Sequence, residues 1–232
     1  MIHHIKGKTQ EFHHVFMDLD GTITESGPGI INAVQYMFER IGVAEDNEER
    51  LRSFIGPPVT ENLKRVYGFS EDEAQQAYVL FREYYERQGV WESRLYEGIV
   101  EAIEDIKSSG KQVYIATAKP EFIALPVLKH FGITELFDRV FAVQREKGIF
   151  DKLQVLQHAA QELGSIPGPV MVGDRNYDIE GGRAVGYATV GVLYGYGSRD
   201  ELLFAGCDYL LDSVKDLTAL LGGSDERAIY RV

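Results

Sequence analysis

The sequence predicts an α/β fold, in which a parallel sheet carries helices on both faces and a helical segment interrupts the alternation. From residue 95 onward, short apolar segments alternate with amphipathic segments and glycine-containing turns. Such alternation is typical of right-handed β–α–β crossovers, which make neighbouring strands parallel. A block with helical periodicity lies between the first strand and this alternation. We therefore predict an α/β core at residues 1–23 and 95–232 and an inserted all-α cap at 24–94.

The core elements follow from apolar runs and from the residues that end them. The first strand is expected at residues 12–17, where an apolar run stops at Asp18. A helix with Phe122 and Leu125 is expected to kink at Pro126. Residues 224–232 are expected to form a loose tail. The remaining predicted strands are 112–116, 140–143, 169–172, 188–193 and 208–211, and the remaining predicted helices are 99–109, 152–163, 179–185 and 214–221.

The helical block has its own boundary signals. Ser70 and Glu73 have the spacing of a capping box, which predicts that a helix begins there. Pro57 and Pro58 predict a stiff turn over residues 54–58, because proline fixes φ and cannot donate a backbone hydrogen bond. Two sets of apolar residues share a helix face or a predicted core: Ile30, Val34, Met37, Phe38 and Ile41, and then Ala74, Ala77, Tyr78, Phe81, Tyr84, Tyr85 and Trp91.

Composition restricts the partners. The 232 residues carry a formal net charge of −12, so we expect no nucleic acid and no anionic membrane surface as a partner. No apolar run is long enough to span a bilayer, and residues 1–10 lack the apolar segment of a secretory signal. Cys207 is the only cysteine, which fits a reducing cytosol, so a cytoplasmic location is expected. A phosphorylated ligand would need a local cation.

Acidic and polar side chains follow the predicted strand ends. Asp18 and Asp20 follow the first strand, Thr117 follows the second, and Asp174 and Asp178 follow a later one. Because ligands of α/β sheets bind beyond the carboxyl ends of the strands, these residues can share one crevice. Lys152, at the start of a helix, can reach the same place.

Several carboxylates in one crevice repel one another, and a bound cation, a lysine or retained protons can relieve the repulsion. Oxygen ligands suit a hard cation such as Mg²⁺, with Asp18 and Asp174 as its direct carboxylate ligands. In an extended chain, Asp18 and Asp20 point to one face, so that one can attack while the other handles a proton.

Two further patterns have ordinary explanations. Adjacent histidines in a strand point to opposite faces, so neither His3-His4 nor His13-His14 makes a good chelate. The glycines around Tyr196, at positions 195 and 197, are not a dinucleotide fingerprint, since no helix-opening third glycine follows. We predict a tight loop there, at the active edge of the sheet.

Four motifs stand in order at the strand ends. They are Asp18-Leu19-Asp20-Gly21-Thr22, Thr117, Lys152, and Gly173-Asp174-Arg175-Asn176-Tyr177-Asp178. Together they resemble the four motifs of the haloacid dehalogenase (HAD) superfamily in its phosphatase form. Within it the chain is most similar to bacterial phosphoglycolate phosphatase-like proteins with a helical C1-type cap. The resemblance implies a Rossmann-like core and a phosphatase, and residues 54–58 resemble the cap loop that faces the active site.

The resemblance implies a role for each motif residue. Asp18 would attack phosphorus and form an aspartyl-phosphate. Asp20 would protonate the leaving oxygen and then deprotonate the attacking water. Thr117, with the backbone N–H of Ala118, would bind a phosphoryl oxygen. Lys152 would stabilise charge on the phosphoryl group and on Asp18.

The resemblance also implies the ligands of the ion and of the substrate. Mg²⁺ would be held by Asp18, Asp174 and the backbone carbonyl of Asp20, with Asp178 positioning these ligands from behind. Small phosphorylated metabolites would be the substrates, and the protein would be a monomer or a homodimer. The remaining expected substrate contacts are Thr22, Gly56 and Pro57.

Several alternatives stay open. Lys147 competes with Lys152 for the third motif, although Lys152 opens a helix. Asp20 argues against dehalogenases and phosphonate hydrolases, which lack that carboxylate. A sugar-phosphate mutase or phosphotransferase shares all four motifs, and Thr22 favours a phosphatase. A nucleotidase or a pyrophosphatase also fits, and a signalling receiver module or a non-catalytic phospho-acceptor or binding protein is the alternative outside enzymes.

Overall fold

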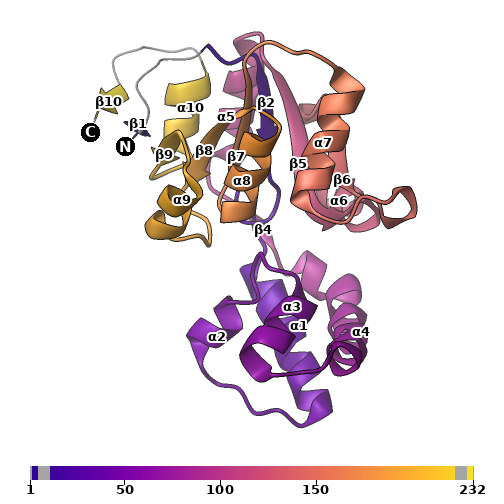
Figure 1. Cartoon of the computed structure of the whole chain (residues 1–232). Coiled ribbons are helices and arrows are strands. Elements are labelled where there is room, and N and C mark those ends of the chain that lie inside the picture. Colours follow the sequence, from indigo (N-terminus) through magenta and orange to yellow (C-terminus); the bar gives the residue numbers. More distant parts are fainter. Residues whose placement is uncertain (1, 5–10, 223–228, 232) are drawn as a thin grey trace. The chain divides into compact units, whose positions relative to one another are not determined.

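The computed structural model describes residues 2–4, 11–222 and 229–231 (Figure 1). The chain forms two compact units, one made of Met1–Thr24 with Leu95–Val232 and the other of Glu25–Arg94. The chain passes between them at β3 (Thr24–Glu25) and β4 (Arg94–Leu95), which pair with each other. No helix in the described part of the chain is both long enough and apolar enough to cross a bilayer.

The first unit contains a sheet in which the strand order is β10-β1-β9-β8-β7-β2-β5-β6. From β9 to β6 the paired strands run parallel, with β2 between β7 and β5. This confirms the predicted α/β class with its parallel sheet. The strands are β1 (Ile2–His4), β2 (His14–Met17), β5 (Gln112–Pro120), β6 (Arg139–Val143), β7 (Pro169–Gly173), β8 (Ala188–Val192), β9 (Tyr209–Leu211) and β10 (Ile229–Arg231).

Three strand predictions need correction. β1 was not predicted, and it pairs antiparallel with β9 and parallel with β10. Residues 229–231 therefore form a strand where a loose tail was expected, and residues 223–228 and 232 lie outside the described residues. The second predicted strand continues from 116 to Pro120, with a register shift between Thr117 and Pro120.

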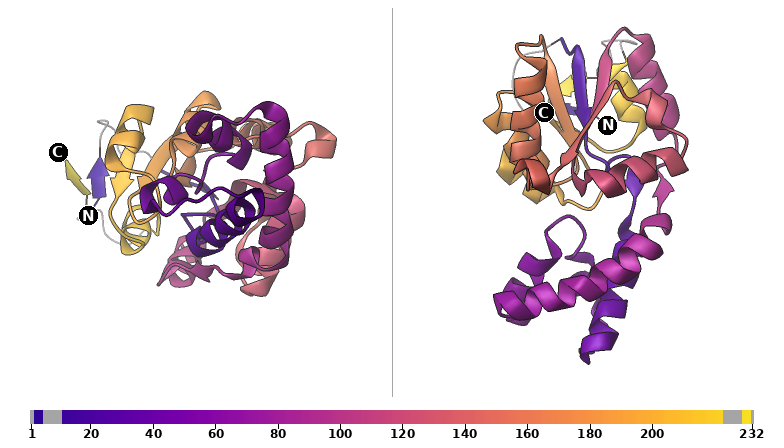
Figure 2. Two further views of the ribbon diagram at one scale, coloured as in Figure 1. Left: turned by 90° about the horizontal axis from the view of Figure 1, so that it is seen from below. Right: turned by 90° about the vertical axis from the view of Figure 1, so that its right-hand side faces the viewer.

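Helices pack on both faces of the sheet (Figure 2). Alternate residues of a strand point to opposite faces, so each strand contributes side chains to the packing on both sides. Phe16, Tyr114 and Met171 pack against Val155 and other residues of α7 in one apolar cluster. Isoleucines of α5 are buried on the other face. The helices of this unit are α5 (Ile99–Ser108), α6 (Glu121–His130, which includes Pro126), α7 (Lys152–Leu163), α8 (Asn176–Ala184), α9 (Arg199–Ala205) and α10 (Lys215–Leu221).

The second unit is helical in its described elements, apart from the pairing strands at its two ends. Its longest helix, α4, begins with the expected capping box, in which Ser70 and Glu73 bind each other's backbone N–H groups. Trp91 is 42% exposed, so its predicted place in the core is wrong, whereas Phe81 and Tyr85 are buried. The elements are α1 (Gly27–Ile41), α2 (Glu48–Arg52), α3 (Val59–Tyr67), α4 (Glu71–Arg87) and the short 3-10 helix Gly89–Trp91.

Candidate active site

Asp18 follows the buried strand β2 directly. Its backbone N–H donates to the carbonyl of Val172 on β7, so the sheet pairing extends to the residue itself. The chain then turns back on itself, because the carbonyl of Leu19 accepts the N–H groups of both Ile23 and Thr24. Gly21 has a φ of +84°, which favours glycine. This turn holds Asp18 buried and leaves Asp20 partly exposed.

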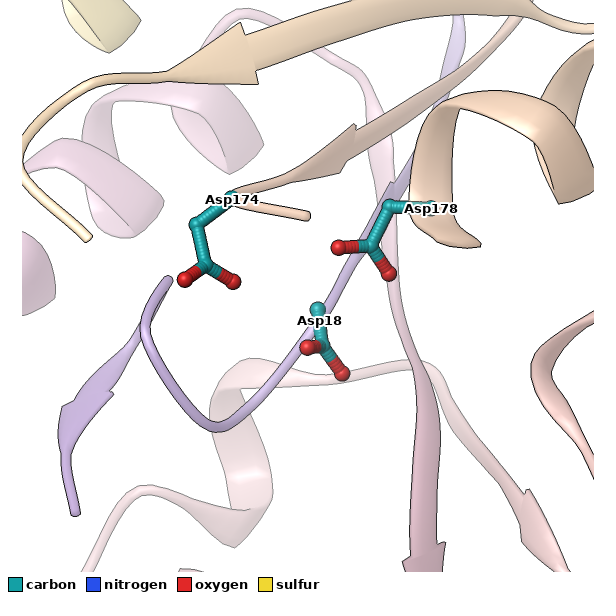
Figure 3. A group of neighbouring side chains, drawn as sticks. All are labelled: Asp18, Asp174 and Asp178. Atoms are coloured by element: carbon teal, nitrogen blue, oxygen red, sulfur yellow. The ribbon is translucent and has the colours of Figure 1, made fainter. Parts of the chain in front are cut away.

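Two more carboxylates come from the end of β7 and the first turn of α8. Asp174 and Asp178 are both buried, and oxygens of Asp18, Asp174 and Asp178 lie within 4.8 Å of one another. Figure 3 shows the three side chains as neighbours, brought together from two separate segments of the chain. A Cβ on Gly173 would lie 2.2 Å from the Asp178 carboxylate, so only glycine fits between the two aspartates. Among the described residues, this is the cluster whose geometry could hold a metal ion.

Lys152 begins α7, and it reaches the same cluster. Its Nζ donates to Asp18 Oδ1 at 2.6 Å and to the Ala116 carbonyl at 2.6 Å, and it lies 2.7 Å from Asp178 Oδ1. Asp151 caps the helix by accepting the N–H of Gln154, which fixes where Lys152 stands. Lys147 is exposed, so the geometry favours Lys152 over its competitor.

Burial and mutual repulsion raise the pKa of two of these carboxyl groups. Burial raises the pKa of Asp18 to about 6, against the lowering effect of Lys152. Burial, and the charges of Asp178 and Asp18, raise the pKa of Asp174 well above its ordinary value. Burial alone would lower the pKa of Lys152, but the two neighbouring carboxylates outweigh it and raise that pKa. When the three carboxylates are ionised, they carry more negative charge than the single lysine can neutralise.

A divalent hard cation would neutralise the remaining negative charge of the cluster. All donors are carboxylate oxygens, as Mg²⁺ prefers. Asp174 Oδ1 is buried and has no hydrogen-bond partner among the described residues, so it is available to a metal ion. Asp178 is engaged differently, because its Oδ2 accepts the backbone N–H of Arg175 while Lys152 holds its Oδ1.

A second lysine, which the sequence reasoning missed, belongs to this site. Lys119 is buried, and its Nζ donates to both oxygens of Asp20, at 2.9 Å and 2.7 Å. Its backbone N–H donates to Thr117 Oγ1 at 3.2 Å. The signal was the period of two in an extended strand, which puts residues 117 and 119 on one face and Ala118, which is exposed, on the other.

The loop after β8 was predicted at the active edge of the sheet, and it surrounds Asp174. The N–H of Tyr196 donates to Asp174 Oδ2 at 2.8 Å. A Cβ on Gly195 would lie 2.3 Å from the Cβ of Asp174, and one on Gly197 would lie 1.9 Å from the Asp174 carbonyl oxygen. The hydroxyl of Tyr194 donates to the Thr22 carbonyl in the turn after β2. The loop therefore links two of the acidic segments.

Three further residues were predicted as substrate contacts, one in the turn after β2 and two in the other unit. Thr22 is buried, and its Oγ1 has no hydrogen-bond partner within the part of the chain that the structure describes. Gly56, with a φ of +105°, and Pro57 lie in the expected bend, within the unit Glu25–Arg94. Their role toward substrate stays a prediction.

The pair His13-His14 lies as predicted from the alternation of side chains along an extended chain. His13 is exposed, and His14 is buried with its Nδ1 3.1 Å from the hydroxyl of Tyr114. The two side chains therefore point in opposite directions. The side chains of His3 and His4 lie outside the described residues.

The protein is of the α/β class, and its parallel sheet carries an acidic cluster and a buried lysine beyond its carboxyl edge. A family model described as "Haloacid dehalogenase-like hydrolase" matches residues 15–192, and the chain belongs to this family. The family predicted from the four motifs is therefore confirmed.

Proteins of known name resemble the chain over most of its length. A 5′-nucleotidase of Pseudomonas aeruginosa is 34% identical, covering 82% of this chain and 87% of that protein. The tyrosine-protein kinase PtkA of Mycobacterium tuberculosis is 35% identical over 80% of this chain, and the chain spans 64% of that protein's length. A phosphoglycolate phosphatase of Nitrosococcus oceani is 28% identical, covering 89% and 95%.

A solved structure supports the fold over the same extent. The crystal structure of a predicted phosphatase from Clostridium acetobutylicum superposes with a TM-score of 0.84 at 31% identity. The match covers 90% of this chain and 97% of that one. The likeness therefore includes nearly all of both chains.

Proposed function

We propose that this protein is a Mg²⁺-dependent phosphatase that hydrolyses a small phosphate monoester through an aspartyl-phosphate on Asp18. The observation that carries the proposal is the buried carboxylate of Asp18, which pairs with Lys152 at 2.6 Å and has the carboxylates of Asp174 and Asp178 within 4.8 Å. Membership of the HAD-like hydrolase family supports it.

In the first half-reaction an Asp18 oxygen attacks phosphorus in line. The bond from phosphorus to the leaving oxygen breaks, and Asp20 gives that oxygen a proton. Lys152 offsets the charge on Asp18 and on the phosphoryl group, and Thr117 hydrogen-bonds a phosphoryl oxygen with the Ala118 N–H. A divalent cation held by Asp18 and Asp174 would supply further charge neutralisation.

In the second half-reaction Asp20, now deprotonated, takes a proton from a water molecule. That water attacks the phosphorus of the aspartyl-phosphate, the acyl–phosphate bond breaks, and inorganic phosphate leaves. Asp18 is regenerated as a carboxylate, and Asp20 again holds a proton. Each residue therefore ends the cycle in the state in which it began.

Relatives support a small phosphorylated metabolite as the substrate class. They include proteins named 5′-nucleotidase and phosphoglycolate phosphatase, so both activities are candidates for this chain. The proposal retains residues 24–94 as a cap with Gly56 and Pro57 facing the substrate, a cytoplasmic location, and a monomer or homodimer. The relative named as a tyrosine-protein kinase favours one competitor, which is phosphoryl transfer to an acceptor other than water.

The test is a panel of phosphorylated metabolites, including phosphoglycolate, a nucleoside monophosphate and pyrophosphate, assayed with Mg²⁺ or with a chelator. Asp18→Asn should lower phosphate release at least about 1,000-fold, because it removes the nucleophile. Asp46→Asn, an exposed aspartate in the other unit, is the matched control and should leave the rate unchanged.

Two results would contradict the proposal. If Asp18→Asn retained turnover while folded, Asp18 would not be the nucleophile. If phosphate were lost from the substrate without release of inorganic phosphate, and appeared on a sugar or on protein tyrosine, the protein would be a phosphotransferase.

A further inference from the structure

The proposed mechanism assigns no role to the ion pair between Lys119 and Asp20. The Lys119 side chain is 4% exposed and that of Asp20 is 22% exposed. The Lys119 ammonium contacts both Asp20 oxygens, at 2.9 Å and 2.7 Å. Because burying an ammonium group costs free energy unless it is paired, the contact holds both side chains in place.

The fold explains why these two residues meet although they are 99 positions apart. β2 and β5 are parallel neighbours, with Met17 opposite Ile115, so the chain just beyond β2 lies beside the continuation of β5. β5 continues to Pro120, which carries Lys119 past the end of β2. The Lys119 N–H also donates to Thr117 Oγ1, so one residue contacts two motif side chains.

Each of the two buried lysines contacts one of the two carboxylates that are proposed to react. Lys152 donates to Asp18 Oδ1, whereas Lys119 holds Asp20 by both oxygens. The Thr24 hydroxyl also donates to Asp20 Oδ1, but at 3.4 Å. Lys119 therefore makes the shorter contacts that set the direction of the Asp20 carboxylate.

We propose that Lys119 is a positioning residue, which keeps its contact with one Asp20 oxygen while the other oxygen carries the proton toward the leaving oxygen; this inference rests on the proposed function of Asp20. A proton from Asp20 matters when the leaving group is a basic alkoxide and matters little when it is a stable phenolate. The contribution of Lys119 therefore depends on the leaving group. A lysine that bound the phosphoryl group itself would contribute equally to all monoesters.

The test compares Lys119→Met, Asp20→Asn and their combination on two substrates, an alkyl phosphate such as phosphoglycolate and p-nitrophenyl phosphate. Lys119→Met should lower kcat for the alkyl phosphate about 100-fold and that for p-nitrophenyl phosphate less than about tenfold, with little change in KM. The combined variant should be no slower than Asp20→Asn. Lys147→Met, which changes an exposed lysine of the same unit, is the matched control and should leave both rates unchanged.

Other outcomes overturn the inference. Equal losses on both substrates, or a change confined to KM, would assign Lys119 to phosphoryl binding. Multiplying losses in the combined variant would mean that Lys119 acts independently of Asp20. If Lys119→Met did not fold, Lys119→Arg and Lys119→Gln would be compared, and a Gln variant as fast as the Arg variant on the alkyl phosphate would contradict the inference. A folded Asp18→Asn protein that still turned over would instead contradict the proposed function.

Discussion

At the residue scale, the site depends on the balance between burial and charge at Asp18. Burial favours the neutral carboxyl group, and Lys152 at 2.6 Å favours the carboxylate. Asp178 and Asp20 add repulsion, so the pKa of Asp18 stays raised, at about 6. A nucleophile needs the charged form, and a cation that binds the same cluster would provide it. In the proposed mechanism, metal binding and activation of the nucleophile would therefore be coupled.

This coupling predicts that Mg²⁺ affinity depends on pH. The pKa of Asp18 is raised from 3.8 to about 6 and that of Asp174 is also raised, so binding must displace protons in acid. Affinity should fall as the pH drops below the Asp18 pKa of about 6, by about tenfold per pH unit for each proton displaced. Calorimetry in two buffers of different ionisation enthalpy measures both the affinity and the protons released. An affinity that is unchanged over this range would contradict the prediction, and Asp174→Asn, which lacks a ligand, is the control for binding elsewhere.

The raised pKa of Asp18 also determines how the stability of the metal-free protein changes with pH. Because the folded-state pKa of Asp18 lies above its unfolded value, its contribution to stability is complete below about pH 4. That contribution is lost as the pH rises through about 6. Added Mg²⁺ should therefore stabilise the protein most where the carboxylates are charged.

At the element scale, three loops at the carboxyl edge depend on close backbone contact. The turn after β2, the β7–α8 junction and the loop after β8 each carry a glycine whose missing Cβ leaves room for an aspartate, and the loop after β8 carries two. These glycines are Gly21, Gly173, Gly195 and Gly197. The arrangement holds the carboxylates close together despite their repulsion.

Gly197→Ala should weaken Mg²⁺ binding without unfolding the protein. The new methyl group would lie 1.9 Å from the Asp174 carbonyl oxygen, so the loop must move and take the Tyr196 N–H away from Asp174. We expect a loss of about 10-fold or more in Mg²⁺ affinity, as for other changes to groups that orient a ligand. Gly110→Ala is the matched control, because Gly110 has a φ of +85° and open space around it. It should cost about 1 kcal/mol of stability and leave Mg²⁺ affinity unchanged. Equal effects on affinity would contradict a specific role for the loop.

At the scale of the whole molecule, every residue of the acidic cluster belongs to the same one of the two units. Asp18, Asp174, Asp178 and both buried lysines belong to the unit Met1–Thr24 with Leu95–Val232. The formal net charge of −12 repels a phosphorylated substrate at a distance. The two lysines and a bound cation would therefore provide attraction only at close range, within the site.

Mg²⁺ should protect the two units unequally from amide hydrogen exchange. At about 100 times its Kd, the ion should stabilise the unit that binds it by about 2.7 kcal/mol. Amides of β2, β5 and β7 should exchange more slowly, while those of α1 and α4 should not change, since no residue of the acidic cluster lies in Glu25–Arg94. Asp174→Asn should remove the protection. Equal protection of both units would show that metal binding is not confined to the first.

The sequence alone was sufficient for the fold class, the family and most local elements. Helix α7 was predicted at 152–163 and spans Lys152–Leu163, because its start and its apolar spacing are local signals. β1 and β10 carry no such signal, since each is a three-residue strand whose stability depends on pairing with a distant segment. Trp91 was misplaced because aromatic character does not say which face of a helical unit a residue occupies.

Tertiary structure alone showed that a second lysine meets the second aspartate of the first motif. The resemblance to the family led us to expect Lys152 near Asp18, and the two pair across 134 positions. The pairing of Lys119 with Asp20 across 99 positions was not expected, and it follows from the order of strands in the sheet. The physical reason is that periodicity and capping act within a few residues, whereas electrostatic partners are chosen by the packing of parallel strands whose ends meet at one edge.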